Sequence, residues 1–119
     1  MDELFDRGIE EFNRGEYFEA HDTWEELWRD TRSEQRLFYQ GLIQAAVGLY
    51  HLSCRNLNGA ERQLGKAIEK LGRYPSAHHG IDTQGLIEAL RIHAAEVGRR
   101  KLGESDPGAG AAPPAIRRV

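Results

Sequence analysis

The chain has 119 residues, of which 39% are hydrophobic and 29% are charged, and its formal net charge at pH 7 is −3. These values are typical of one globular domain that is long enough to form a core without disulfides or metal. They exclude a membrane-spanning helix, because no apolar run approaches the ~20 residues that a span needs, and they argue against a dedicated nucleic-acid binder, whose surface would be basic.

The N-terminal residues MDELFDRG lack the basic and then apolar segments of a secretory signal. The single cysteine, Cys54, cannot form an internal disulfide and fits a reducing compartment. We therefore expect a cytoplasmic protein that does not associate with membranes.

Two helices are predicted at the start of the chain. Apolar residues recur at three-to-four spacing over residues 2–13, and a second helix is expected from about residue 16 to residue 29. Gly15 between them can take the left-handed conformation that ends helices, so the second helix should fold back on the first. This hairpin resembles one tetratricopeptide repeat unit in the spacing of Gly8, Gly15, Tyr17, Ala20, Trp24 and Leu27. One unit implies a helix pair, because a true array needs several repeats.

The third predicted helix, from about residue 34 to residue 54, is the most apolar and should be central. Ser33 can cap it. Its apolar stripe is made of Leu37, Phe38, Leu42, Ala45, Ala46, Leu49 and Leu52. Gly41 and Gly48 indicate that another backbone approaches closely, since glycine destabilises a helix interior by about 0.5–1 kcal/mol relative to alanine.

Two further helices are expected in the second half of the chain. Asn58 and Glu61 have the spacing of a capping box for a helix that ends at Gly72. Residues 73–80 should form an exposed loop that holds His78 and His79. Asp82 or Thr83 can cap a fifth helix, which ends by residue 102 and places His93 on its apolar face.

The predicted fold is therefore an all-α, compact five-helix bundle built from antiparallel hairpins, with one domain over residues 1–102. Residues 103–119 are rich in Gly, Ala and Pro and have little to bury, so we expect a disordered C-terminal tail.

The second predicted helix carries a candidate site. His21, Glu25 and Trp28 lie on one face beside the apolar stripe and should be partly buried. A second polar stripe on the third helix, with Gln44 and His51, can face them. Polar groups at such a boundary must satisfy one another or a ligand.

The sequence resembles the bacterial and archaeal family known as domain of unknown function 309. The likeness rests on FNRGEY, on His-x-x-x-Glu-x-x-Trp at His21, Glu25 and Trp28, and on GLIQAAVGLYH and NGAERQLGKAIEKL, and it covers about residues 4–71. It implies an all-α fold and a role of the motif in metal binding, and it implies no particular activity.

Two interpretations of the motif remain open. His21 and Glu25 can both reach one ion, for which His51 is the best third ligand, so a divalent metal such as zinc and a metal-dependent hydrolase are one hypothesis. Alternatively, His21 and Glu25 form an ion pair covered by Trp28 and completed by Gln44 or His51.

The sequence contains no complete catalytic set, and it leaves open whether the protein is an enzyme. The favoured function is a non-catalytic module that binds a small molecule or a protein at a site lined by His21, Glu25, Trp28, Gln44 and His51. The alternative is the metal-dependent hydrolase. A homodimer is also possible in principle.

Overall fold

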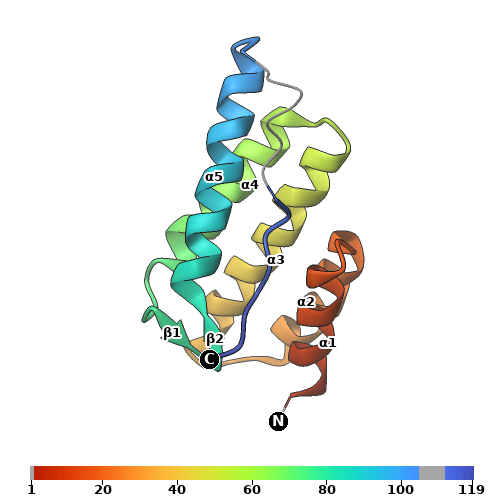
Figure 1. Ribbon diagram of the computed structural model, residues 1–119. Coiled ribbons are helices and arrows are strands. Elements are labelled where there is room, and N and C mark those ends of the chain that lie inside the picture. The colour runs from red at the N-terminus through yellow and green to blue at the C-terminus, as the bar shows by residue number, and fades with distance from the viewer. Residues whose placement is uncertain (1, 105–111) are drawn as a thin grey trace.

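The computed structural model describes residues 2–104 and 112–119. The elements in chain order are α1 (Glu3–Asn13), α2 (Tyr17–Asp30), α3 (Gln35–Ser53), α4 (Leu57–Leu71), β1 (Ala77–His78), β2 (Ile81–Asp82) and α5 (Thr83–Lys101). Successive helices run antiparallel and form a bundle that is elongated along α5, as Figure 1 shows. The predicted all-α bundle of five helices is confirmed. No helix in the described part of the chain is sufficiently long and apolar to cross a bilayer.

The first hairpin forms around a close contact between α1 and α2. Gly15 has a φ of 79°, so it ends α1 in the predicted left-handed conformation. A Cβ atom at Gly8 would collide with the indole of Trp24, which is fully buried and donates a hydrogen bond of 3.3 Å to the Phe5 carbonyl oxygen. The absence of a side chain at Gly8 therefore lets the largest core residue pack directly on the α1 backbone.

α3 lies between α2 and α4, as predicted (Figure 1). A Cβ atom at Gly48 would lie 3.0 Å from the backbone nitrogen of Leu64, so α4 approaches closely at the predicted position. The predicted burial of Leu37 is wrong, because its side chain is 41% exposed, whereas Tyr39 and Ile43 are buried. α3 packs on two helices at once, so its buried surface extends beyond the single stripe that periodicity identifies.

The helix caps agree in part with the predictions. Ser33 Oγ accepts a hydrogen bond from the Gln35 backbone, and Asp82 caps α5 through the Gly85 N–H at 2.9 Å. The capping residue of α4 is Asn56, and the predicted Asn58 lies inside the helix. Asn56 caps α4 because its side chain accepts a hydrogen bond from the Gly59 N–H.

A short β-hairpin that the sequence analysis missed replaces the expected loop before α5. β1 and β2 pair antiparallel through a two-residue turn, in which His79 and Gly80 have φ angles of 52° and 79°. Two positive φ values are typical of the type I′ turn that matches the twist of a hairpin. His79 is exposed, as predicted, whereas His78 is half-buried.

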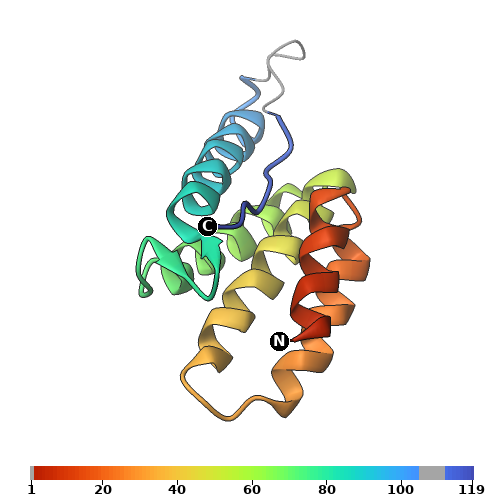
Figure 2. The same ribbon diagram turned by 60° about the horizontal axis from the view of Figure 1, so that its bottom comes forward.

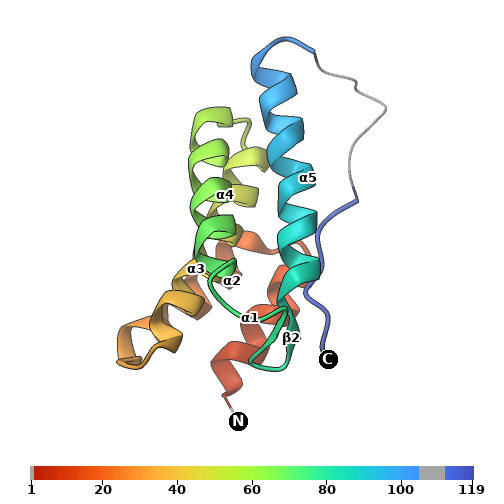
Figure 3. The same ribbon diagram turned by 90° about the vertical axis from the view of Figure 1, so that its left-hand side faces the viewer.

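Residues 112–119 form an extended segment that runs back along α5, between that helix and α1 (Figures 1 and 2). The expectation of disorder is therefore wrong for this segment, and residues 105–111 lie outside the described part of the chain. The segment pairs with β2, where Asp82 N–H donates to the Arg117 carbonyl at 2.8 Å and Val119 N–H donates to the Gly80 carbonyl at 3.1 Å. Figure 3 shows it lying along the side of α5.

Three side chains explain why this segment is ordered. Ile116 is buried, and the Asn13 amide both donates to its carbonyl oxygen at 3.0 Å and accepts from its N–H at 2.7 Å. Arg118 forms an ion pair of 2.9 Å with Asp6. The segment thus connects α1 to the hairpin, and the composition of the tail could not reveal these contacts because all the partners lie far away in the sequence.

Candidate functional site

The motif side chains lie where the sequence places them, on one face of α2 and partly buried. His21 Nε2 lies 3.1 Å from Glu25 Oε2, and Glu25 Oε1 accepts a hydrogen bond of 2.8 Å from Arg29. The side chains of His21 and Glu25 retain 22% and 34% of their exposure. His21, Glu25 and Arg29 therefore form a row of interacting side chains at the edge of the core.

Trp28 is the motif residue closest to the C-terminal end of α2. The Arg36 guanidinium lies 3.9 Å from the centre of the Trp28 ring and donates hydrogen bonds to the carbonyl oxygens of Trp28 and Thr31. A cation over an indole face is attracted by the ring quadrupole. Arg36 thus holds the end of α2 against the start of α3.

The second polar stripe faces the motif across the seam between α2 and α3. Its members on α3 are all half-buried: Gln40, Gln44, Val47 and His51. Within the described residues, Gln44 Oε1 and Trp28 Nε1 are buried and have no hydrogen-bond partner. The expected network is therefore incomplete, because neither Gln44 nor His51 bonds to His21 or Glu25.

A small hollow of about 190 Å³ opens on this seam, and its lining is mainly apolar. It is lined by Phe18, His21, Val47, Tyr50 and His51. The ring centres of Phe18 and His21 are 5.6 Å apart, and those of Phe18 and Tyr50 are 5.4 Å apart. Phe18 and Tyr50 remain 48% and 38% exposed, so an aromatic rim surrounds the hollow.

We refer to this surface as the α2–α3 face. It consists of Phe18, His21, Glu25, Trp28, Gln44, Val47, Tyr50 and His51. Phe18 was missed by the sequence analysis, although its position three residues before His21 places it on the same side of a helix. Arg29 was missed as well, although it follows Glu25 by four residues.

The residues of the motif do not fit a metal centre. Both Glu25 oxygens are engaged, one of them by the cationic Arg29. His51 Nδ1 lies 3.2 Å from the Asn56 amide nitrogen. In the parts of the chain that the structure describes, no three His, Cys, Asp or Glu side chains could jointly hold an ion. A catalytic zinc needs three protein ligands, so the hydrolase hypothesis lacks its ligand set.

A second group of polar side chains gathers at the other end of α3. His78 Nε2 lies 2.8 Å from Gln35 Oε1, Gln35 Nε2 lies 3.1 Å from His79 Nδ1, and His79 Nε2 lies 3.1 Å from the Tyr39 hydroxyl. The Phe38 and His78 rings meet edge to face, 4.7 Å apart. Burial and the neighbouring His79 lower the pKa of His78. His78 Nε2 and both ring nitrogens of His79 therefore have hydrogen-bond partners.

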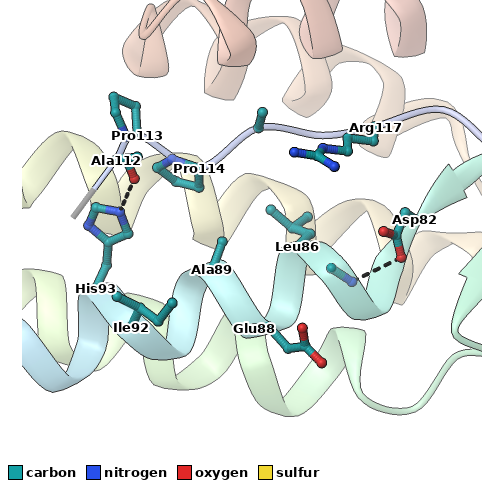
Figure 4. A pocket seen from close by; sticks show the side chains of 12 residues that line it. Asp82, Leu86, Glu88, Ala89, Ile92, His93, Ala112, Pro113, Pro114 and Arg117 are labelled. Atoms are coloured by element: carbon teal, nitrogen blue, oxygen red, sulfur yellow. Dashed lines mark hydrogen bonds between the residues drawn. The ribbon is translucent and has the colours of Figure 1, made fainter.

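A larger hollow, of about 440 Å³, lies between α5 and the C-terminal segment (Figure 4). Leu86 and Ala89 line it on the helix, and Pro113 and Pro114 line it on the segment. His93, the expected core histidine, is buried at one end and its Nε2 lies 3.0 Å from the Ala112 carbonyl oxygen. His93 therefore anchors the start of the segment to α5.

Comparison with known proteins gives relatives without an assigned function. The chain is 35% identical over 72 residues to the uncharacterized protein YpuF of Bacillus subtilis (strain 168), an alignment that covers 60% of this chain and 40% of that protein. It is 27% identical over 94 residues to an uncharacterized protein of Aquifex aeolicus (strain VF5), covering 77% of this chain and 27% of that protein. The chain thus spans less than half the length of these two relatives. The model of a domain of unknown function, DUF309, matches residues 5–63, from α1 through the α2–α3 face into α4, and the chain belongs to this family.

Proposed function

We propose that this chain is a non-catalytic protein-binding module, and that its α2–α3 face accepts one apolar side chain of a partner protein. The observation that supports this most directly is the exposed aromatic rim of Phe18 and Tyr50 around an apolar hollow. Interface hot spots are typically apolar or aromatic anchors that fill such a recess while surrounding contacts exclude water.

The size of the hollow favours a protein segment over a free small molecule. Its volume of about 190 Å³ is below the roughly 300–1,000 Å³ of pockets that bury drug-sized ligands. One leucine or phenylalanine side chain fits such a volume, and the rest of the partner would lie on the rim.

Charge favours a basic partner. Glu19 follows the rim residue Phe18 on α2, and its side chain is exposed. The Cys54 thiol, burial and, most weakly, the Glu19 carboxylate raise the pKa of the Tyr50 hydroxyl. Complementary charge steers association and selects partners. The expected partner segment therefore carries Lys or Arg beside its apolar anchor.

Two buried polar atoms without hydrogen-bond partners in the described part of the chain support the proposal that side chains between α2 and α3 rearrange when a partner binds. An unpaired buried polar atom costs about 1–3 kcal/mol, and within the described residues Trp28 Nε1 and Gln44 Oε1 are both unpaired. Rearrangement of these side chains toward a partner would recover part of this free energy.

Selection from a random peptide display library tests the proposal. We expect enriched peptides to combine one large apolar residue with neighbouring basic residues, and to bind the wild type at least tenfold more tightly than F18A or Y50A. L102A is the matched control, because Leu102 is 76% exposed on the far end of α5. Peptides that bind all four proteins equally, or that lack an apolar anchor, would refute the proposed site.

A cytoplasmic location is part of the same proposal. It rests on Cys54, which is a free and exposed thiol, since such thiols persist in reducing compartments. Because the chain spans less than half of the relatives reported above, the identity of the partner is to be sought with full-length relatives as well.

A further inference from the structure

One amide group joins the two histidines of the β-hairpin. Gln35, at the first position of α3, lies between His78 of β1 and His79 of the turn, at 2.8 Å and 3.1 Å. Gln35 lies 12 positions along α3 from Val47, a rise of about 18 Å, so Gln35 and its two histidines lie at the other end of α3. They are therefore separate from the α2–α3 face.

The hydrogen-bonding capacity of the amide limits how many protons the pair can carry. A glutamine oxygen only accepts and its nitrogen only donates. His78 Nε2–H therefore donates to Gln35, while His79 Nδ1 accepts from Gln35 and its Nε2–H donates to the Tyr39 hydroxyl oxygen. Rotating the amide by half a turn exchanges the roles of His78 and His79. In either orientation one imidazole must present an unprotonated nitrogen, so both cannot be charged while both bonds persist.

The hairpin carries the C-terminal segment. The N–H groups of Asp82 and Val119 donate to the carbonyl oxygens of Arg117 and Gly80. Ile116 of this segment is buried, and its backbone is held on the other side by the Asn13 amide. Asn13 and Asp6 hold the segment on α1, so displacement of the hairpin from Gln35 would strain the two hydrogen bonds between the hairpin and the segment.

Charged and titratable groups surround both histidines. On the side of His79, the neighbours are Asp2 and Asp6 of the α1 end, Tyr39 of α3, and Arg118, which is paired with Asp6. On the side of His78, the neighbours are Glu34, Tyr74 and Arg73, which is paired with Glu69. Each histidine thus has both acidic and basic neighbours. The Gln35 amide is the group that can bond to both imidazoles only while one of them is neutral.

We propose that Gln35, His78 and His79 form a pH-operated latch, which holds the hairpin and the C-terminal segment while one imidazole is neutral and releases them when both are protonated. The released state binds one more proton than the latched state. Release therefore becomes more favourable as the pH falls, by up to about tenfold for each pH unit. The opened groove between α1 and α5 would expose the surface that Ile116 now covers.

Amide hydrogen exchange of the full chain tests the latch at the N–H groups of Asp82 and Val119. After correction for the intrinsic rate, we expect their protection to fall at least tenfold between pH 7.5 and pH 5.5. The N–H groups in the middle of α3 serve as the reference and should change less than twofold. Protection at Asp82 and Val119 that is independent of pH, or that changes in parallel with α3, would overturn the proposal.

Two substitutions of Gln35 distinguish release of the proposed latch from a general loss of stability in acid. The carboxylate of Q35E can accept from two protonated imidazoles, so its protection at Asp82 and Val119 should stay constant or rise as the pH falls to 5.5. Q35M has no polar group to mediate between the imidazoles, so its protection should already be low at pH 7.5 and vary less than threefold. A fall in Q35E as steep as in the wild type would overturn the proposal even if Q35M does not fold.

Discussion

Two regions of α3 use similar side chains in opposite ways. At its N-terminal end, Gln35 and Tyr39 meet two histidines, and the facing polar atoms are all paired. Further along, His51 and His21 line one hollow, and Gln44 Oε1 and Trp28 Nε1 are buried without a partner among the described residues. The first cluster packs against aromatic rings and has satisfied hydrogen bonds, so we call it closed, although His79 is exposed and hollows reach both histidines. The second lines an apolar hollow with an exposed aromatic rim, so we call it open.

This difference distinguishes a structural cluster from a candidate binding surface. Histidines, amides and aromatic rings occur in both, so residue types alone do not separate the two. Their hydrogen bonds separate the two regions. A satisfied network favours one arrangement of side chains, whereas unsatisfied polar groups at an open seam gain hydrogen bonds when a ligand binds. The following substitutions challenge this contrast, in order of decreasing expected effect.

Replacement of Gln35 in the closed cluster should have the largest effect. Q35M removes the acceptor of His78 and the donor to His79, so we expect the free energy of unfolding to fall by about 2 kcal/mol at pH 7.5. Chemical denaturation monitored by tryptophan fluorescence measures this loss. A loss below about 0.5 kcal/mol would mean that the network contributes little.

Loss of the contacts that hold the C-terminal segment should lower the free energy of unfolding by less than Q35M does. N13A removes both hydrogen bonds to Ile116, so we expect unfolding to become easier by about 1 kcal/mol. The control is N58A, since Asn58 is exposed on α4 and should be within about 0.5 kcal/mol of the wild type. Equal stability of N13A and N58A would show that the segment is not held as described.

Acid should destabilise the closed cluster. Burial and the nearby His79 hold the pKa of His78 below its ordinary value near 6.5. Stability from neutral His78 is therefore complete above about pH 6.5 and is lost as the pH falls through the lower, folded-state value. Denaturation at pH 7.5, 6.5 and 5.5 should show this decline in the wild type and a smaller one in H78N. A wild-type stability that rises toward pH 5.5 has the wrong sign for this account.

Replacement of Gln44 in the open seam should be nearly neutral for stability. Q44M removes an oxygen that has no partner among the described residues, so we expect a change between zero and a gain of about 1 kcal/mol. The comparison with Q35M is matched, because both glutamines are half-buried on the same helix. A loss as large as that of Q35M would place Gln44 in a satisfied network and would remove the contrast.

Substitutions on the rim should have the smallest effect on stability. Phe18 and Tyr50 are exposed, so F18A and Y50A should unfold within about 0.5 kcal/mol of the wild type. Thermal unfolding checks this expectation. Losses above about 2 kcal/mol would identify the rim as part of the core and would contradict a surface kept for a partner.

The sequence was sufficient to predict the helices and the partly buried edge of α2. Periodicity located the five helices, and the i, i+4 spacing of His21 and Glu25 gave their contact, because these signals are local. The left-handed Gly15 and the close approach at Gly48 followed from the special conformational properties of glycine.

Features that depend on distant residues could not be predicted in this way. The Asn13 contacts with Ile116 span 103 positions, and nothing in the Gly- and Pro-rich tail indicates that its end pairs with β2. The hairpin was missed because each strand has only two residues, too few to show an alternating pattern. The openness of the α2–α3 face likewise depends on which side chains α4 and α5 leave uncovered.

The most direct test of the account is NMR mapping of a peptide selected on the immobilised chain. Titration of the ¹⁵N-labelled protein should give its largest amide and imidazole shift changes at residues 18, 21, 47, 50 and 51, with changes at residues 35, 39, 78 and 79 near the noise. Shift changes concentrated at Gln35, His78 and His79, with the α2–α3 face unaffected, would contradict the central claim.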